Sequence, residues 1–111
     1  FAGRVAILVD CRSGSASEFL AGGLQDIGRA RVFGTRSMGA VLSSIVERLR
    51  NGDGFQYVFG NYVTAGGTRL EGVGVTPDEE VVATRDELLA GRDPVLERAV
   101  AWILHRSEHT I

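Results

Sequence analysis

The first third of the chain alternates between short apolar runs and a stretch of helical spacing. Arg4–Asp10 is a continuous apolar run that ends in a polar turn, the pattern of a strand buried on both faces of a parallel sheet. From Ser15 to Gly28 the apolar residues recur at the spacing of an amphipathic helix. Ala30–Gly34 is a second short apolar run. This order predicts a right-handed βαβ unit.

The middle of the chain has the pattern of a β-hairpin. Val41–Arg50 alternates loosely between apolar and polar residues, and Phe55–Thr64 is rich in aromatic and β-branched residues. The sequence Asn51-Gly52-Asp53-Gly54 between them is a strong turn signal. A further short strand is predicted at Arg69–Glu71, after a glycine-rich turn.

The last third predicts a loop and two helices. Gly72–Asp78 is expected to be a loop, and the adjacent carboxylates of Asp78-Glu79-Glu80 are typical of a solvated turn. Asp86–Ala90 fits a short helix. Asp93-Pro94 combines an N-cap residue with a proline at the first helical position, which opens an amphipathic helix through Ile103. The predicted fold class is therefore α/β, a βαβ unit followed by a β-hairpin and a C-terminal helix.

Composition narrows the classes of function. The chain has 111 residues, 44% hydrophobic content and a formal net charge of -2, so nothing draws it to nucleic acid and no nucleic-acid partner is expected. A single Cys and two His provide no metal-ligand spacing, and we expect neither a metal nor a cofactor. The 12 basic residues are all arginines, since the sequence contains no lysine.

The candidate chemistry lies where the first strand gives way to the helix, in Ser13-Gly14-Ser15-Ala16-Ser17-Glu18. Backbone N–H groups are unpaired at a helix start, and the helix dipole favours negative charge there. Ser15 at this corner is a candidate nucleophile, with the N–H of Ala16 as an oxyanion donor. Ser15 and Glu18 also match a capping box. The local pattern alone favours the cap.

Several motifs in the correct order resemble the tail-specific, or carboxyl-terminal processing, serine proteases of peptidase family S41. The serine-rich turn continues into Ala16-Ser17-Glu18, and the helix ends in a motif of the Leu-Gln-Asp-x-Gly-Arg-Ala type at 24–30. Later matches are Tyr62-Val63-Thr64, Gly67-Thr68-Arg69 and the Gly-Val-x-Pro-Asp-like segment 72–78. The resemblance covers nearly the whole chain.

The resemblance implies a fold, a partner and a role for Ser15. Residues 1–111 would be the C-terminal, nucleophile-bearing part of an S41 catalytic domain, a partial spiral core like that of the ClpP and crotonase group. Ser15 would be the nucleophile, the N–H of Ala16 would serve the oxyanion, and the substrate would be a polypeptide. An upstream part of the same protein, or another chain, would complete the sheet, because an unpaired edge strand needs a neighbour. The resemblance also allows a homo-oligomer, and it favours the bacterial cell envelope as the compartment, with the cytosol as the alternative.

One family residue is missing. Where the common subgroup has a catalytic lysine, this sequence has Ala40, and Ser44 stands where a supporting glutamine is found. Arg36 cannot act as a base, because a guanidinium stays protonated. In tricorn-like members a histidine from an earlier segment is the base, and by that resemblance Glu71 is expected to orient it. The alternative is that Glu71 is a solvent-facing residue at the end of a strand.

Three explanations for the missing lysine remain open. In the first, the base comes from outside this chain. In the second, activity has been lost and the fold binds peptides or apolar ligands, as in the retinoid-binding relatives. In the third, activity requires the upstream half. His105 and His109 are poor candidates for the base, since they lie in the C-terminal helix and tail, which the family keeps away from the nucleophile.

Overall fold

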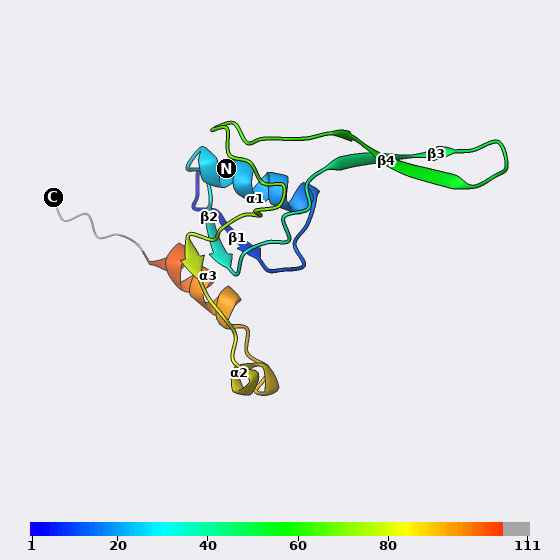
Figure 1. Ribbon diagram of the computed structural model, residues 1–111. Helices are drawn as coiled ribbons and strands as arrows, with labels where there is room; N and C mark the ends of the chain where they lie inside the picture. The colour runs from blue at the N-terminus through cyan, green and yellow to red at the C-terminus, as the bar shows by residue number, and fades with distance from the viewer. Residues whose placement is uncertain (106–111) are drawn as a thin grey trace.

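The computed structural model describes residues 1–105 and confirms the α/β class. Figure 1 shows a small α/β body from which a long hairpin projects. The elements, in chain order, are β1 (Ala6–Val9), α1 (Ala16–Asp26), β2 (Arg31–Gly34), β3 (Ser43–Arg48), β4 (Gly54–Gly60), β5 (Glu79–Glu80), α2 (Arg85–Leu89) and α3 (Pro94–Leu104). The predicted βαβ unit, hairpin and C-terminal helix are all present.

The body contains a three-stranded parallel sheet in the order β1-β2-β5. β1 and β2 pair from Ala6↔Arg31 to Val9↔Gly34, with α1 as the crossover between them. Within the described residues, β1 pairs only with β2 and its other edge has no strand beside it. Leu8 of β1 is 39% exposed, so the expectation of a strand buried on both faces is wrong for this position.

The carboxylate-rich segment before α2 corrects one prediction. Glu79 and Glu80 do not form a solvated turn, because they pair in parallel with Phe33 and Gly34 and become strand β5. The Glu79 carboxylate meets the guanidiniums of Arg31 and Arg98. These contacts neutralise the charge that made the segment look solvated, and the β2 backbone supplies the strand partner.

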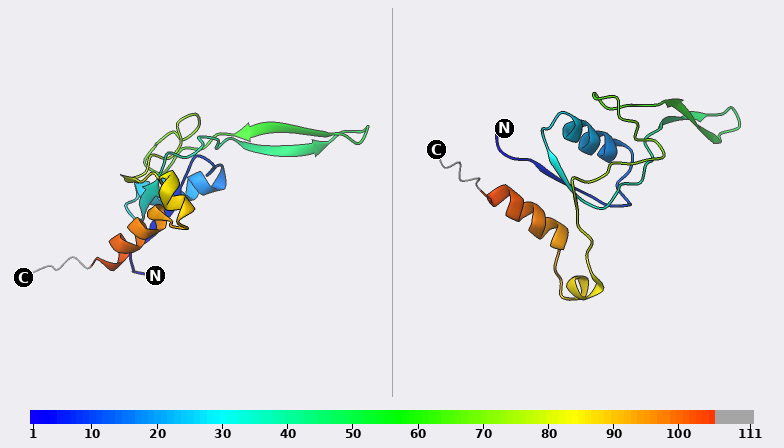
Figure 2. Two further views of the ribbon diagram at one scale, coloured as in Figure 1. Left: turned by 90° about the horizontal axis from the view of Figure 1, so that it is seen from below. Right: turned by 60° about the vertical axis from the view of Figure 1, so that its left-hand side comes forward.

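Helices cover both faces of the sheet (Figures 1 and 2). Val32 of β2 packs with Ala21 of α1 in the core, whereas the neighbouring Phe33 meets Trp102 of α3 with ring centroids 5.7 Å apart. Successive strand residues point to opposite faces, so one strand serves both helices. The buried cluster between the sheet, α1 and the loops consists of Val9, Ala21, Val32, Val41, Leu70 and Val75.

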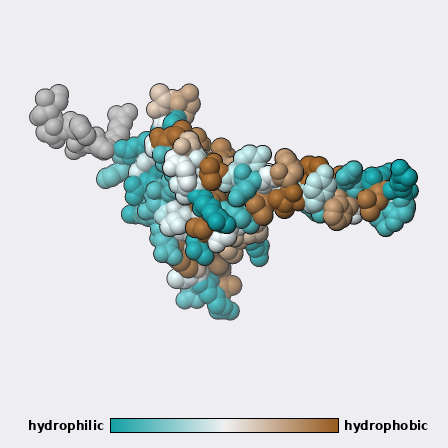
Figure 3. All heavy atoms as spheres, turned by 45° about the horizontal axis from the view of Figure 1, so that its top comes forward, coloured by the Kyte–Doolittle hydropathy of each residue, from teal (hydrophilic) through white to brown (hydrophobic). Residues whose placement is uncertain are grey.

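The hairpin forms an arm that extends away from the body (Figures 1 and 2). β3 and β4 pair antiparallel, with Ile45 opposite Tyr57. Both strands are shorter than predicted, because regular pairing ends at Arg48 and at Gly60. Figure 3 shows hydrophobic residues along the arm, and Ile45 is 44% exposed.

The return from the arm to the body differs from the prediction. Arg69–Glu71 is not a strand, since Arg69 forms only an isolated bridge with Val63. The loop is fixed instead by Asp26 at the end of α1, whose carboxylate accepts hydrogen bonds from the Thr64 hydroxyl and from the Gly66 N–H. Side-chain hydrogen bonds therefore hold this segment, and not the backbone pairing of a strand. The pattern of hydrophobic residues does not reveal such contacts.

The two C-terminal helices begin with the expected caps. Thr84 and Glu87 form a capping box at the start of α2. The Asp93 carboxylate accepts a hydrogen bond from the Leu96 N–H at 3.0 Å, and Pro94 occupies the first turn of α3. No helix within residues 1–105 is long and apolar enough to cross a membrane.

Gly34 at the end of β2 provides a test of this packing. Its φ is +122°, and a Cβ at this position would lie 2.0 Å from the carbonyl oxygen of Val9. Gly34→Ala is therefore expected to reduce the free energy of unfolding by about 3 kcal/mol, measured by chemical denaturation. Gly23→Ala is the matched control, because a Cβ there meets nothing within 4 Å and alanine favours a helix. Equal stability of the two variants would contradict this account of the β1–β2 contact.

Candidate functional site

Ser15 lies on a strained corner between β1 and α1. Its backbone angles are φ 55° and ψ -124°, and it is the only non-glycine residue within 1–105 with a positive φ. Such a conformation is costly for a residue with a Cβ, and it persists only where the surroundings enforce it. The Ser15 N–H is held by the Ala40 carbonyl at 2.8 Å and by the Glu18 carboxylate at 3.0 Å, and the side chain is exposed.

The capping role and the nucleophile role coexist at this corner. Ser15 is the N-cap of α1, and its side chain and that of Glu18 are arranged as a capping box. However, of the two contacts in this box only the one from the Ser15 N–H to the Glu18 carboxylate is a hydrogen bond. The Glu18 N–H donates to the Ser15 backbone carbonyl at 2.9 Å, and within residues 1–105 the Ser15 hydroxyl makes no side-chain cap hydrogen bond. The hydroxyl therefore remains available for chemistry.

Glu18 is a fully buried carboxylate that joins the serine corner to a distant loop. It accepts hydrogen bonds from the Ser15 N–H at 3.0 Å, the Gly39 N–H at 2.6 Å, the Ala40 N–H at 3.0 Å and the Ser37 hydroxyl. Burial raises the pKa of this carboxyl, but the four hydrogen bonds outweigh burial and hold the pKa below its ordinary value. Glu18 is thus an ionised clamp on the loop 37–40.

The sequence predicts Glu18 only as a helix cap, and its buried hydrogen bonds to the loop 37–40 are a functional feature that no local pattern reveals. The partners from the loop lie 19 to 22 positions away in the chain, so no local pattern joins them. The available signal was the glycine at position 39. It has φ +75°, and a Cβ there would lie 3.1 Å from the backbone nitrogen of Gly74, so only glycine fits this crossing of two loops.

Ala16 follows Ser15 as the first residue of α1 and is exposed. The N–H groups of the first helical turn have no intrahelical acceptor, and the positive end of the helix dipole lies at the same place. An oxyanion that forms beside Ser15 would therefore meet a backbone donor and a favourable field. This placement is compatible with the oxyanion role predicted for the Ala16 N–H.

Ala40, where the resemblance expects the family lysine, lies beside Ser15 and carries only a methyl group. Ala40 is in contact with Ser15 through the hydrogen bond from the Ser15 N–H to its carbonyl. His105 caps the far end of α3, and its carbonyl accepts a hydrogen bond from Arg4, which precedes β1. Ser15 follows the opposite end of β1, so His105 is remote from it. His109 lies outside the described residues.

Glu71 lies next to the same loop. Its Oε2 accepts hydrogen bonds from the N–H groups of Val41 at 2.7 Å and Leu42 at 3.1 Å. Glu71 is half-buried, and within residues 1–105 its Oε1 receives no hydrogen bond. One oxygen thus fixes the chain just after Ala40, and the second is left for another donor.

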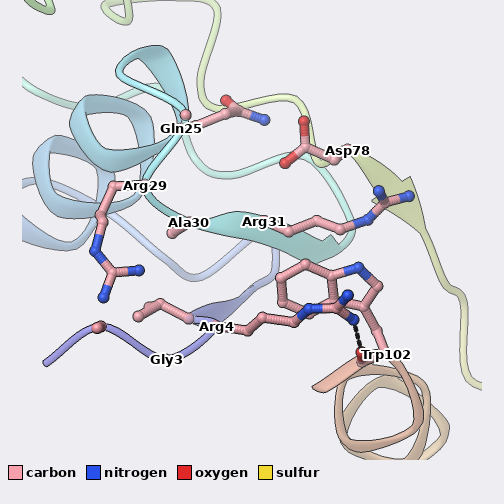
Figure 4. Close-up of a pocket in the computed structure, with 11 residues that line it drawn as sticks. Gly3, Arg4, Gln25, Arg29, Ala30, Arg31, Asp78 and Trp102 are labelled. Carbon is pink, nitrogen blue, oxygen red and sulfur yellow. Dashed lines mark hydrogen bonds between the residues drawn. The ribbon is translucent and has the colours of Figure 1, made fainter. Parts of the chain in front are cut away.

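Two other kinds of site receive no support. Residues 1–105 contain no group of three histidine, cysteine or acidic residues arranged to hold a metal ion. A recess of about 470 Å³ lies at the opposite end of the sheet from Ser15, lined by Arg4, Arg31 and Trp102 among others (Figure 4). Arg4 donates there to the backbone carbonyl of Trp102, and Arg31 meets Glu79. These arginines hold the fold together.

An exposed serine on a strained strand-to-helix turn is the arrangement in which α/β hydrolases present a nucleophile. Comparison with known proteins gives the family. The sequence pattern of peptidase family S41 matches residues 1–81, and the chain belongs to this family. The predicted resemblance is confirmed.

Individual relatives agree with the family assignment. A carboxy-terminal-processing protease of Bartonella bacilliformis is 35% identical over 83% of this chain, which spans 21% of that relative. The solved photosystem II D1 C-terminal processing protease matches with a TM-score of 0.66 and 35% identity, over 72% of this chain and 21% of that one. The tricorn protease matches at 24% identity with a TM-score of 0.79, over 90% of this chain and 10% of its own, which shows a shared fold. The chain spans about a fifth or less of the length of these relatives.

Proposed function

We propose that residues 1–111 are the C-terminal, nucleophile-bearing part of an S41-type serine peptidase catalytic domain that acts on polypeptides. Ser15 Oγ attacks the carbonyl carbon of a peptide bond, and the Ala16 N–H donates to the oxyanion of the tetrahedral intermediate. The amine leaves with a proton, and the acyl group stays on Ser15 until water hydrolyses the ester. The names of the Bartonella relative and of the solved photosystem II D1 protease, both processing proteases, support this reaction.

The observation that carries the proposal is the strained backbone of Ser15. A simple N-cap residue has an extended backbone, as Thr84 does at the start of α2 with φ -78° and ψ 158°. Ser15 has φ 55° instead, and the buried clamp of Glu18 holds it there. A helix cap alone has no need of this strain, whereas a presented nucleophile does.

The general base in this proposal comes from outside the chain. Lysine is absent from the sequence, and Ala40 has no group that accepts a proton. An upstream part of the same protein, or another chain of a homo-oligomer, completes the sheet at the free edge of β1 and brings the base to Ser15. Glu71 Oε1 is in place to accept a hydrogen bond from that base and so to orient it.

Labelling with a fluorophosphonate tests the proposal. In the full-length protein, the reagent should modify Ser15, and mass spectrometry of the tryptic peptides should locate the adduct there and not on Ser13 or Ser17. The reaction should rise with pH as the base loses its proton.

The methyl group of Ala40 favours a second candidate, an inactive member that binds peptides without cleaving them. Saturable peptide binding in the full-length protein, together with no adduct on Ser15, would replace the peptidase proposal with this one.

A further inference from the structure

Met38 places an oxidisable sulfur on the surface of the loop that faces the serine corner. It is the only methionine of the 111-residue sequence, and it is 55% exposed. Its neighbours Ser37 and Gly39 are buried. A small oxidant in water therefore reaches the Met38 side chain, whereas the residues on either side of it are shielded.

The Met38 side chain lies against the residue that directly precedes Ser15. A Cβ added to Gly14 would be 3.2 Å from the Met38 sulfur and 3.6 Å from its terminal methyl carbon, so the thioether packs on the bare backbone of this glycine. The Met38 N–H also donates to the Ser13 carbonyl at 2.9 Å. Met38 thus supports the serine corner with both its backbone and its sulfur.

The loop around Met38 is fixed and does not move aside when this side chain changes. The Ser37 N–H donates to the Val75 carbonyl at 3.1 Å. The Ser37 hydroxyl and the Gly39 N–H both bind the buried carboxylate of Glu18. Closely packed surroundings transmit strain, so a chemical change at Met38 is passed on to the serine corner.

We propose that Met38 is a site of reversible oxidation by peroxide, and that its oxidation slows the reaction of Ser15. The sulfur lone pair forms a bond to one oxygen of hydrogen peroxide, the O–O bond breaks, and the second oxygen leaves as water with both protons. The sulfur is oxidised to a sulfoxide and the peroxide is reduced. Methionine sulfoxide reductases reverse the step with a dithiol, which becomes a disulfide while the oxygen leaves as water.

The sulfoxide does not fit where the thioether lies. Oxidation turns a flexible apolar side chain into a polar one, and the new oxygen adds volume to a sulfur that already touches Gly14. Burying this oxygen against the glycine without a donor is costly, so the contact that supports the corner is lost. The strained backbone of Ser15 depends on such contacts, and a small displacement of a reacting group slows catalysis strongly. This effect on rate rests on the proposed peptidase function, whereas the oxidation itself does not.

The test treats the full-length protein with hydrogen peroxide and measures the rate of fluorophosphonate labelling of Ser15. Mass spectrometry of the tryptic peptide 37–48 should show the gain of one oxygen atom. We expect labelling to slow at least about tenfold and to recover after treatment with methionine sulfoxide reductases A and B and dithiothreitol. Met38→Leu keeps an apolar side chain of similar volume and should label at the same rate before and after peroxide. Cys11→Ser removes the exposed thiol of the same turn and should remain as sensitive as wild type.

The outcomes separate this site from the proposed function. Equal slowing in Met38→Leu, insensitivity of Cys11→Ser, an unoxidised peptide 37–48 or a loss that the reductases do not restore would each overturn the Met38 site and leave the peptidase intact. If untreated wild type shows neither turnover nor labelling, the peptidase proposal fails. The Met38 site is then judged by hydrogen–deuterium exchange of segment 13–18. Faster exchange in oxidised wild type but not in peroxide-treated Met38→Leu supports it, and unchanged exchange overturns it.

Discussion

Ser15→Ala in the full-length protein is expected to reduce peptide cleavage by about 10⁴-fold or more, with the fold intact. Removal of the nucleophile leaves only the acceleration that comes from substrate binding and the oxyanion donors. Stability should change little, because the Ser15 hydroxyl makes no side-chain cap hydrogen bond and the strained backbone is retained. The measurement is kcat/KM on a peptide substrate, accompanied by thermal unfolding of both proteins.

Ser17→Ala is the matched control for this experiment. Ser17 lies in the first turn of α1, two residues from Ser15, and it is also exposed. It should keep wild-type turnover, because its backbone is helical and nothing presents it to a substrate. Wild-type turnover in Ser15→Ala would show that another residue is the nucleophile. A loss of stability near 1 kcal/mol with unchanged turnover would show that Ser15 is only a helix cap.

The sequence was sufficient to predict the elements whose signals are local. The apolar run before Asp10 and the helical spacing after Ser15 predicted the βαβ unit, and Asp93-Pro94 predicted the start of α3. β5 was missed because its strand character comes from pairing with β2 and from the arginines that neutralise Glu79. Both partners lie far from Glu79 in the chain, so the local pattern of hydrophobic and polar residues does not reveal them.

The candidate site divides in the same way. Position in the chain placed Ser15 at a strand-to-helix corner, but it did not reveal the positive φ, which a sequence signals only through glycine or asparagine. The contacts of Glu71 with residues 41 and 42 likewise join segments about 30 positions apart. Both features appear only once the loop 37–42 lies against the serine corner.

These contacts make the geometry of Ser15 depend on Glu18. The carboxylate binds the Ser15 N–H on one side and two N–H groups of the facing loop on the other, so the strain at Ser15 and the position of residues 39 and 40 both depend on it. A buried acceptor with this many donors is costly to remove, because each donor would lose its partner.

Glu18→Gln is therefore expected to lower the free energy of unfolding by about 3 kcal/mol and to slow the labelling of Ser15. The amide keeps the size of the side chain. Its NH₂ group is a donor, however, and it would point at N–H and O–H groups that need an acceptor. Glu47→Gln, an exposed carboxylate in β3, is the control and should change neither quantity. Chemical denaturation and the rate of fluorophosphonate labelling measure the two effects.

The pH dependence distinguishes loss of the charged clamp from a general packing defect. The pKa of Glu18 in the folded state is below its ordinary value of 4.5, so its contribution to stability is complete above about pH 4.5 and is lost as the pH falls through the folded pKa. The difference in unfolding free energy between wild type and Glu18→Gln should accordingly be constant above pH 4.5 and shrink below it. Asp26 and Glu87 also have lowered pKa values, but they are present in both proteins and cancel in the difference. A difference that stays constant down to low pH would mean that Glu18 acts through its shape, and the ionised clamp would be wrong.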